Sequence, residues 1–273
     1  MKKIIYSVAF ALLAILNACT KEIITIDDDS DVPVVEAFLE PGKEVSVKLS
    51  KMLPFSEDEY TGSLTIDTAE VYINYNGADY LLTPVSDEPG KYVSLDSALT
   101  ATAGGSYNLY FSYNGYTITS TTSIPSQPVN VGLSSTTLRI DPTVMGPGSI
   151  QDPMTITWEN PDNTYYLIVV EYLESTYDPI NENMNSENFD QFQKVSTDPV
   201  SVNSYNLDTR QHLVFFGSYK VIIYKVNEEY VNLYENVSQS SLNLTEPLTN
   251  IENGLGIFTG INSDTLFLEV KEI

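Results

Sequence analysis

The stretch YNLYFSYNGYTI, residues 107–118, decides the fold class of this chain. Apolar or aromatic side chains stand at every second position from Tyr107 to Tyr113, so they share one face of a strand. Asn114-Gly115 then supplies the positive φ angles of a type I′ turn, and the alternation resumes through Ile118. The stretch predicts a β-hairpin.

The same signals extend outward from this hairpin. Residues 45–49 alternate in the same way, and a further alternating run, residues 70–75, meets a second turn at Asn76-Gly77. Short strands between such turns predict a β-sandwich. We therefore expect an immunoglobulin-like β-sandwich over residues 33–125, which ends at a proline-bearing joint.

Residues 126–273 predict a second β-rich domain that resembles a fibronectin type III sandwich. The near-continuous apolar run of residues 165–172 is typical of a strand buried on both faces. Residues 174–199 form a long, Asn- and acid-rich excursion, and loops of this length are either functional or disordered. Helical spacing of apolar side chains predicts one short helix near residues 229–239. The predicted fold class is thus mostly β, with two tandem β-sandwich domains and one short helix.

The first twenty residues predict export. Lys2 and Lys3 lead into an apolar run, residues 4–16, that is too short to span a bilayer. Leu16-Asn17-Ala18-Cys19 resembles the lipobox of bacterial lipoproteins, whose cysteine is acylated and becomes the N-terminus after cleavage. We expect residues 1–18 to be a signal peptide and Cys19 to carry the acyl chains (palmitate) that anchor the protein to membrane lipid. The alternatives are an ordinary signal peptide with an incidental cysteine, or a buried free thiol.

Residues 19–32 predict an acidic tether between this anchor and the first domain. The clustered carboxylates of Asp27 to Asp31 repel one another and favour an extended chain. A calcium loop is the alternative, but the run lacks the central glycine and closing glutamate of an EF-hand. Lys21-Glu22 partly matches the signal that sends Bacteroidetes lipoproteins to the outer face of the outer membrane. We expect an outer-membrane lipoprotein exposed at the cell surface, with a periplasm-facing orientation as the alternative.

The chain is strongly acidic, because 13 Lys and Arg oppose 37 Asp and Glu, for a formal net charge of −24. Removing Lys2 and Lys3 with the signal leaves 11 against 37, or −26. Such a field repels nucleic acid and anionic lipid head groups, so we expect no nucleic-acid partner. It suits colloidal solubility or a basic partner. The single cysteine excludes an intrachain disulfide.

Catalytic and metal-binding patterns are weak. His212 is the only histidine and borders an apolar run, so we expect a structural role rather than a nucleophilic triad. Zinc sites need several His or Cys ligands, and we expect no metal and no cofactor. Residues 254–260 superficially resemble a dinucleotide loop, but the glycine spacing is wrong and we expect a tight surface turn. A pair of carboxylates for glycoside hydrolysis is kept as an alternative, since acids occur along the whole chain and no pair is singled out.

The C-terminal stretch, Glu246 to Phe258, carries a family resemblance. Its Pro247, Asn250-Ile251 and Gly254-Leu255-Gly256-Ile257-Phe258 resemble the closing signature Pro-x-x-x-Asn-Ile-x-Gly-Gly-Leu-Gly-Ile-Phe of a Bacteroidetes lipoprotein family. That family is catalogued as domain of unknown function 4249 (DUF4249). Here Asn253 replaces the first glycine, a mild departure because Asn also tolerates left-handed backbone.

The early part of the chain is similar to the same family in its lipobox, acidic tether, Val34 to Ala37, the segment 49–54 and Ser123-Ile124-Pro125. The resemblance implies an immunoglobulin-like domain, a second β-rich domain and a surface or periplasmic lipoprotein, often associated with TonB-dependent outer-membrane receptors. It implies no assigned chemistry and no functional residues.

Three short matches to the Asp-Ser/Thr-aliphatic acceptor pattern of Bacteroidetes O-glycosylation place candidate acceptors at Thr68, Ser97 and Thr265. The ligand-binding residues are not identified by the sequence. The favoured function is a non-catalytic interaction module that is accessory to a TonB-dependent receptor or other outer-membrane complex. We expect residues 174–199 to make a contact with the partner. The alternatives are a carboxylate-only carbohydrate- or peptide-processing enzyme and a solitary adhesive surface protein.

Overall fold

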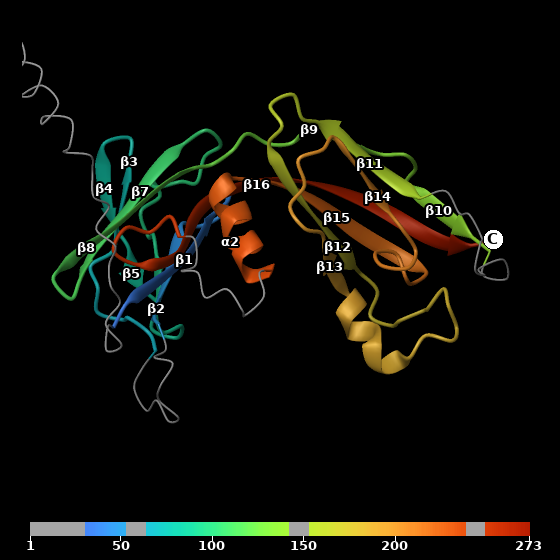
Figure 1. Cartoon of the computed structure of the whole chain (residues 1–273), viewed down its shortest axis with the longest axis horizontal. Helices are drawn as coiled ribbons and strands as arrows, with labels where there is room; N and C mark the ends of the chain where they lie inside the picture. Colours follow the sequence, from blue (N-terminus) through green and yellow to red (C-terminus); the bar gives the residue numbers. More distant parts are fainter. Residues whose placement is uncertain (1–30, 53–63, 142–152, 239–248) are drawn as a thin grey trace, which may run out of the picture. The chain divides into compact units, whose positions relative to one another are not determined.

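The computed structural model describes residues 31–52, 64–141, 153–238 and 249–273. Its first part builds a four-stranded sheet, in the order β4-β3-β7-β8, facing one end of a larger sheet in which β1, β2, β6 and β5 are neighbours (Figure 1). The strands of this part are β1 (Pro33–Leu39), β2 (Ser46–Lys51), β3 (Tyr72–Tyr75), β4 (Ala78–Leu81), β5 (Thr83–Pro84), β6 (Lys91–Val93), β7 (Ser106–Tyr113) and β8 (Tyr116–Ser123).

The hairpin predicted from residues 107–118 is confirmed. β7 and β8 pair antiparallel with Tyr113 opposite Tyr116, so only Asn114 and Gly115 form the turn. Their φ angles are 50° and 83°, the left-handed values that a type I′ turn requires. Because side chains alternate across the strand, Tyr107, Leu109 and Phe111 all point into the first core and are fully buried.

The second part has its own core, between a three-stranded sheet, β14-β11-β9, and the other end of the larger sheet. Its elements are β9 (Val129–Leu133), β10 (Thr137–Ile140), β11 (Met154–Glu159), β12 (Tyr165–Tyr172), the 3₁₀ helix η3 (Ser186–Phe192), β13 (Lys194–Ser196), β14 (Ser204–Leu207), β15 (Gly217–Val226), α2 (Glu228–Ser238) and β16 (Leu255–Glu272). The fold is mostly β with β-sandwich architecture, as predicted. The short helix predicted at 229–239 is confirmed as α2.

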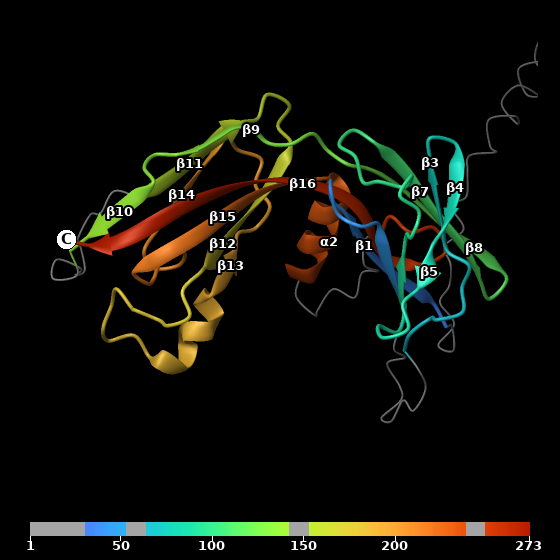
Figure 2. The ribbon, with the colours of Figure 1, turned by 180° about the vertical axis from the view of Figure 1, so that it is seen from behind.

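One strand, β16, serves both parts of the fold (Figures 1 and 2). Its first residues pair parallel with β1, from Val34 opposite Leu255 to Leu39 opposite Gly260. The following residues pair antiparallel with β15, and the last ones pair parallel with β10. Phe258 lies in the first core and Leu268 in the second, ten positions apart, as expected for a period of two.

The division between the predicted domains at residues 125 and 126 therefore needs a correction. Ile251 and Phe258, which were assigned to the second domain, belong to the first core. The C-terminal stretch returns to the first part of the fold because β1 needs a partner on the side opposite β2, and β16 provides it.

The predicted surface turn at residues 254–260 is wrong, because this segment enters a sheet. Gly256 and Gly260 lie where the backbone of a neighbouring strand passes very close. A Cβ added to Gly256 would lie 2.0 Å from the carbonyl oxygen of Val35, and one on Gly260 would lie 2.3 Å from that of Ser123. Gly256 also has a φ of 98°. These glycines permit close packing of main chains.

The predicted tether, residues 19–32, also needs a shorter boundary. Asp31 is fixed to the first part of the fold, since Lys51 Nζ donates to its carboxylate at 3.0 Å and Tyr113 Oη does so at 2.6 Å. The compact unit accordingly begins at Asp31. Residues 19–30 of the predicted tether, which include Cys19, and the signal peptide lie outside the described residues. In the described part of the chain, no helix has the length and apolar character needed to cross a membrane.

Candidate functional site

The excursion, residues 174–199, is the strongest candidate for a functional surface, and it is ordered. Three aromatic rings hold it against the second core: the rings of Tyr177 and Phe189 lie 5.0 Å and 5.4 Å from that of Phe215, and 5.4 Å from each other. Phe215 itself is fully buried. Aromatic clusters of this geometry contribute about 0.5–1.5 kcal/mol per pair beyond the burial of their area.

Hydrogen bonds set the local path of the excursion. Asn185 caps η3, because its side chain accepts from the backbone N–H of Glu187 at 3.1 Å. Tyr177 Oη donates to Asp190 at 2.8 Å, and this bond raises the pKa of Tyr177. At the start of the excursion, the carboxylate of Glu174 accepts from the backbone N–H of Ser218 at 3.1 Å. The excursion is therefore held at its start and in its middle.

The outward side of the excursion is acidic. It carries six carboxylates and a single cation, Lys194, all of them exposed. The carboxylates belong to Glu174, Asp178, Glu182, Glu187, Asp190 and Asp198. Of these, Asp198 accepts from Tyr234 Oη of α2 at 2.5 Å, which connects the end of the excursion to the helix. A fixed backbone that displays one sign of charge is suited to binding a basic surface.

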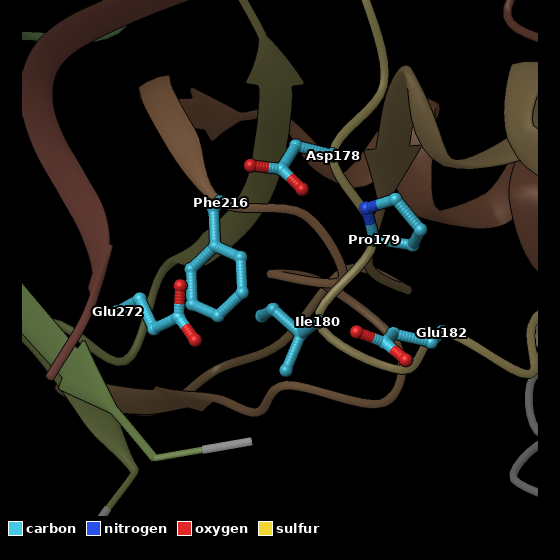
Figure 3. Close-up of a pocket in the computed structure, with 6 residues that line it drawn as sticks. All are labelled: Asp178, Pro179, Ile180, Glu182, Phe216 and Glu272. Carbon is cyan, nitrogen blue, oxygen red and sulfur yellow. The ribbon is translucent and has the colours of Figure 1, made fainter.

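An open hollow of about 230 Å³ lies beside the excursion (Figure 3). Phe216 and Ile180 form its apolar side, and the carboxylates of Asp178, Glu182 and Glu272 stand around it. The backbone N–H of Phe216 donates to the carbonyl of Asp178 at 2.8 Å, so the two sides of the hollow are joined through the main chain. Within the described ranges, no group of three His, Cys, Asp or Glu is placed to hold a metal ion.

His212 lies away from this hollow and is buried. Its Nδ1 accepts from the backbone N–H of Asp208 at 3.3 Å, and its Nε2 lies 3.4 Å from Tyr205 Oη. Burial lowers the pKa of His212, and the nearby carboxylate of Asp208 acts in the opposite direction without outweighing it. The ring is thus neutral at pH 7 and orders the segment that follows β14.

Two carboxyl groups have a pKa lowered from the usual value. The pKa of Glu171 is lowered mainly by a hydrogen bond from Lys220 Nζ at 2.8 Å. For Asp31, desolvation raises the pKa, but the hydrogen bonds from Tyr113 and Lys51 together outweigh it. Both shifts have the direction of a paired structural carboxylate, opposite to the raised pKa of a general acid.

The structure does not bring the candidate glycosylation acceptors together. Thr68 lies in the segment before β3, Ser97 follows β6, and Thr265 is in the middle of β16. All three side chains are exposed, so the sites stay predictions that an intact-mass measurement of the purified chain would test. Sequence reasoning missed the anchoring role of Tyr177 and Phe189, although the three aromatics within this polar run, Tyr177, Phe189 and Phe192, were the available signal.

Comparison with known proteins gives one family match. The sequence model of the domain of unknown function DUF4249 matches residues 20–266. No curated protein matches the sequence. Among solved structures, the chain is similar to the crystal structure of the chicken CNTN1 FN1–FN3 domains, at 12% identity and a TM-score of 0.28. That match covers 72% of this chain and 60% of the other chain.

Proposed function

The chain belongs to the DUF4249 family, and from this premise we propose that it is a non-catalytic interaction module anchored to the outer membrane. In this proposal Cys19 carries the lipid anchor, the protein is exposed at the cell surface, and it acts as an accessory to a TonB-dependent receptor or another outer-membrane complex. The source is a Bacteroidetes bacterium, as the resemblance of the signature and lipobox implies.

The observation that carries the proposal is the excursion, residues 174–199. A loop of this length that is fixed by Tyr177 and Phe189 yet turns its charged side chains to solvent loses little entropy when it binds. Its excess of carboxylates favours a partner with a basic surface and speeds association with it at low salt.

The runner-up is a carbohydrate- or peptide-processing enzyme that uses carboxylates alone. The feature that favours it is the hollow of Figure 3, where Asp178, Glu182 and Glu272 stand around an apolar floor. Hydrolysis of a polysaccharide or peptide by the native chain, lost in Glu272→Gln, would favour this reading over the interaction module.

The test is recovery of the full chain from its native outer membrane in mild detergent, with Cys19→Ala as the anchor control. We expect a β-barrel partner in stoichiometric amount with the native chain. The double variant Glu182→Lys, Glu187→Lys reverses charge on the excursion, and Glu44→Lys, Glu70→Lys makes the same change on exposed sites elsewhere.

We expect the excursion variant, Glu182→Lys, Glu187→Lys, to lose the partner and the matched variant, Glu44→Lys, Glu70→Lys, to keep it. Equal recovery with both variants would show that the excursion makes no essential contact. A chain that is recovered alone, and is cleaved by protease added to whole cells, would instead fit a solitary adhesive protein.

A further inference from the structure

Strand β16 has a stretch that pairs with another strand on one side only. Its partner β1 ends opposite Gly260, and its partner β10 begins opposite Glu269. Over the eight residues between them, Ile261 to Leu268, the described strands pair with β16 only through β15, on the opposite side. We call residues 261–268, on the side away from β15, the β16 slot.

The orientation of the main chain in the β16 slot follows from its ends. The N–H of Glu269 points away from β15, because it donates to the carbonyl of Thr136 at 3.0 Å. Successive N–H groups of a strand point to opposite sides, so those of Ser263, Thr265 and Phe267 also face the slot. The ladder with β15 uses the even-numbered residues and does not depend on these three groups.

The first two of these N–H groups donate to side chains and not to a neighbouring strand. Ser263 N–H donates to Asn262 Oδ1 at 2.9 Å, and Thr265 N–H donates to Asp264 Oδ1 at 2.8 Å. Asn262 is itself fixed, since it is 7% exposed and its Nδ2 donates to the carbonyl of Pro125 at 2.9 Å. Asp264 is only half-buried, so its carboxylate can turn into solvent and release the N–H of Thr265.

We propose that the β16 slot binds an extended peptide segment of a partner protein, which adds as a strand between β1 and β10. This inference deepens the proposed interaction role and rests on it. The slot is about 26 Å long at a strand rise of ~3.3 Å per residue, which suits one strand of five to eight residues. Glu40, which accepts from Ser263 Oγ at 3.1 Å, marks the end of the slot near β1, so binding centres on Thr265 and Phe267.

The β16 slots of two copies of this chain cannot pair with each other, for geometric reasons. Each slot is recessed between its β1 and β10, and two recessed edges of equal length cannot meet along their backbones. A single extended segment has no such flanks and can enter. The strand edge would then be continuous from β1 to β10, with the peptide carbonyl replacing Asp264 at the N–H of Thr265.

The side chains beside the slot indicate what the peptide should carry. Phe267 is 61% exposed, an unusual exposure for a large apolar residue in the middle of a strand. It lies opposite Lys220 on β15, whose charge is already neutralised by Glu171. A peptide side chain next to Phe267 on this face would bury its ring, so we expect an apolar or β-branched residue there.

The experiment uses the full chain in mild detergent and measures amide hydrogen exchange at single residues. The probe is a seven-residue peptide of alternating threonine and valine, with one lysine added at each end for solubility. We expect fast exchange at Thr265 and Phe267 in the free chain and protection of both when the peptide is present. Slow exchange in the free chain would overturn the proposal, since the edge would already be covered.

Two substitutions at one position distinguish the contribution of the main-chain N–H from that of the aromatic side chain. Phe267→Pro and Phe267→Ala both remove the aromatic ring, but only proline removes the N–H that faces the slot. We expect the proline variant to bind the peptide at least about tenfold more weakly than the alanine variant. Proline removes one hydrogen bond to the peptide, and its pyrrolidine ring occupies space in the slot. Equal affinities would refute strand addition.

A third variant keeps the test valid if the proline variant does not fold. Asp264→Ala removes the carboxylate that competes for the N–H of Thr265, so the peptide should bind a few-fold more tightly. Unchanged or weaker binding would count against the proposal. Because the probe is synthetic, its failure would leave recovery of a membrane partner through the excursion untouched, and the two proposals can fail separately.

Discussion

The side chain of Asn250 takes the place of a strand beside Phe258, and its removal gives the sharpest prediction. Asn250 Nδ2 donates to the carbonyl of Phe258 at 2.7 Å, and its Oδ1 accepts from the N–H of Phe258 at 3.1 Å. Its own carbonyl accepts from Ser120 Oγ at 2.7 Å, which fixes the residue to β8. Phe258 is fully buried and Asn250 is partly buried, so water has restricted access to these two main-chain groups.

Asn250→Ala would leave both main-chain groups of Phe258 without a partner. Each unsatisfied buried group costs about 1–3 kcal/mol, so the variant should lose about 2–6 kcal/mol of unfolding free energy. That loss is a large part of the ~5–15 kcal/mol that a native protein has. The measurement is urea denaturation followed by far-UV circular dichroism, which reports the loss of all the sheets.

Asn108→Ala is the matched control. Asn108 is exposed and accepts from Thr121 Oγ1 at 2.7 Å on the outside of the four-stranded sheet, so its loss should cost less than about 1 kcal/mol. If Asn250→Ala cost no more than this control, the argument that its amide substitutes for a strand would be wrong. Trp158 is the only tryptophan and lies in the second core, so its fluorescence shows whether that core loses stability too.

Two further predictions concern a glycine and the histidine. Gly256→Ala should cost several kcal/mol or prevent folding, because its Cβ would lie 2.0 Å from the carbonyl oxygen of Val35. Gly42→Ala, at a φ of 77° with nothing within 4 Å of its Cβ, should cost only about 1 kcal/mol in the same urea denaturation assay. Since the folded pKa of His212 lies below its ordinary value of 6.5, its contribution to stability is constant above pH 6.5 and falls as pH drops towards the folded pKa. His212→Asn should therefore flatten the decline of unfolding free energy between pH 6.5 and more acidic values, and an unchanged slope would contradict this account.

Local signals in the sequence were sufficient for the hairpins and the helix. Asn76-Gly77 and Asn114-Gly115 adopt the left-handed φ angles that their types favour, and the strands on either side pair as predicted. Helical spacing located α2 within one residue at each end. In each case the information lies within about twelve consecutive residues, where turn chemistry and periodicity operate.

The sequence could not predict which distant strands pair. The parallel ladder of β1 and β16 joins Val34 to Leu255, and alternation alone does not show that one strand contributes to both cores. The glycines of residues 254–260 therefore suggested a turn, although their role is to let main chains approach. The path of the excursion was not predictable either. Its polar composition indicated only a long loop, whereas the contacts of Tyr177 and Phe189 determine its path.

The shared strand also bears on how the candidate surfaces work together. The ladders of β16 with β1 and with β15 meet without overlap between Gly260 and Ile261, so bending between the two parts of the fold would occur there. A polar cluster opposes such bending: the carboxylate of Glu229 in α2 accepts from Thr122 Oγ1 at 2.6 Å and from Thr259 Oγ1 at 3.2 Å. Because Thr122 is in β8 and Thr259 in β16, the helix joins the first core to the shared strand. A partner bound at the excursion or in the β16 slot would therefore act on one continuous sheet, and strand addition between β1 and β10 would strengthen the same connection.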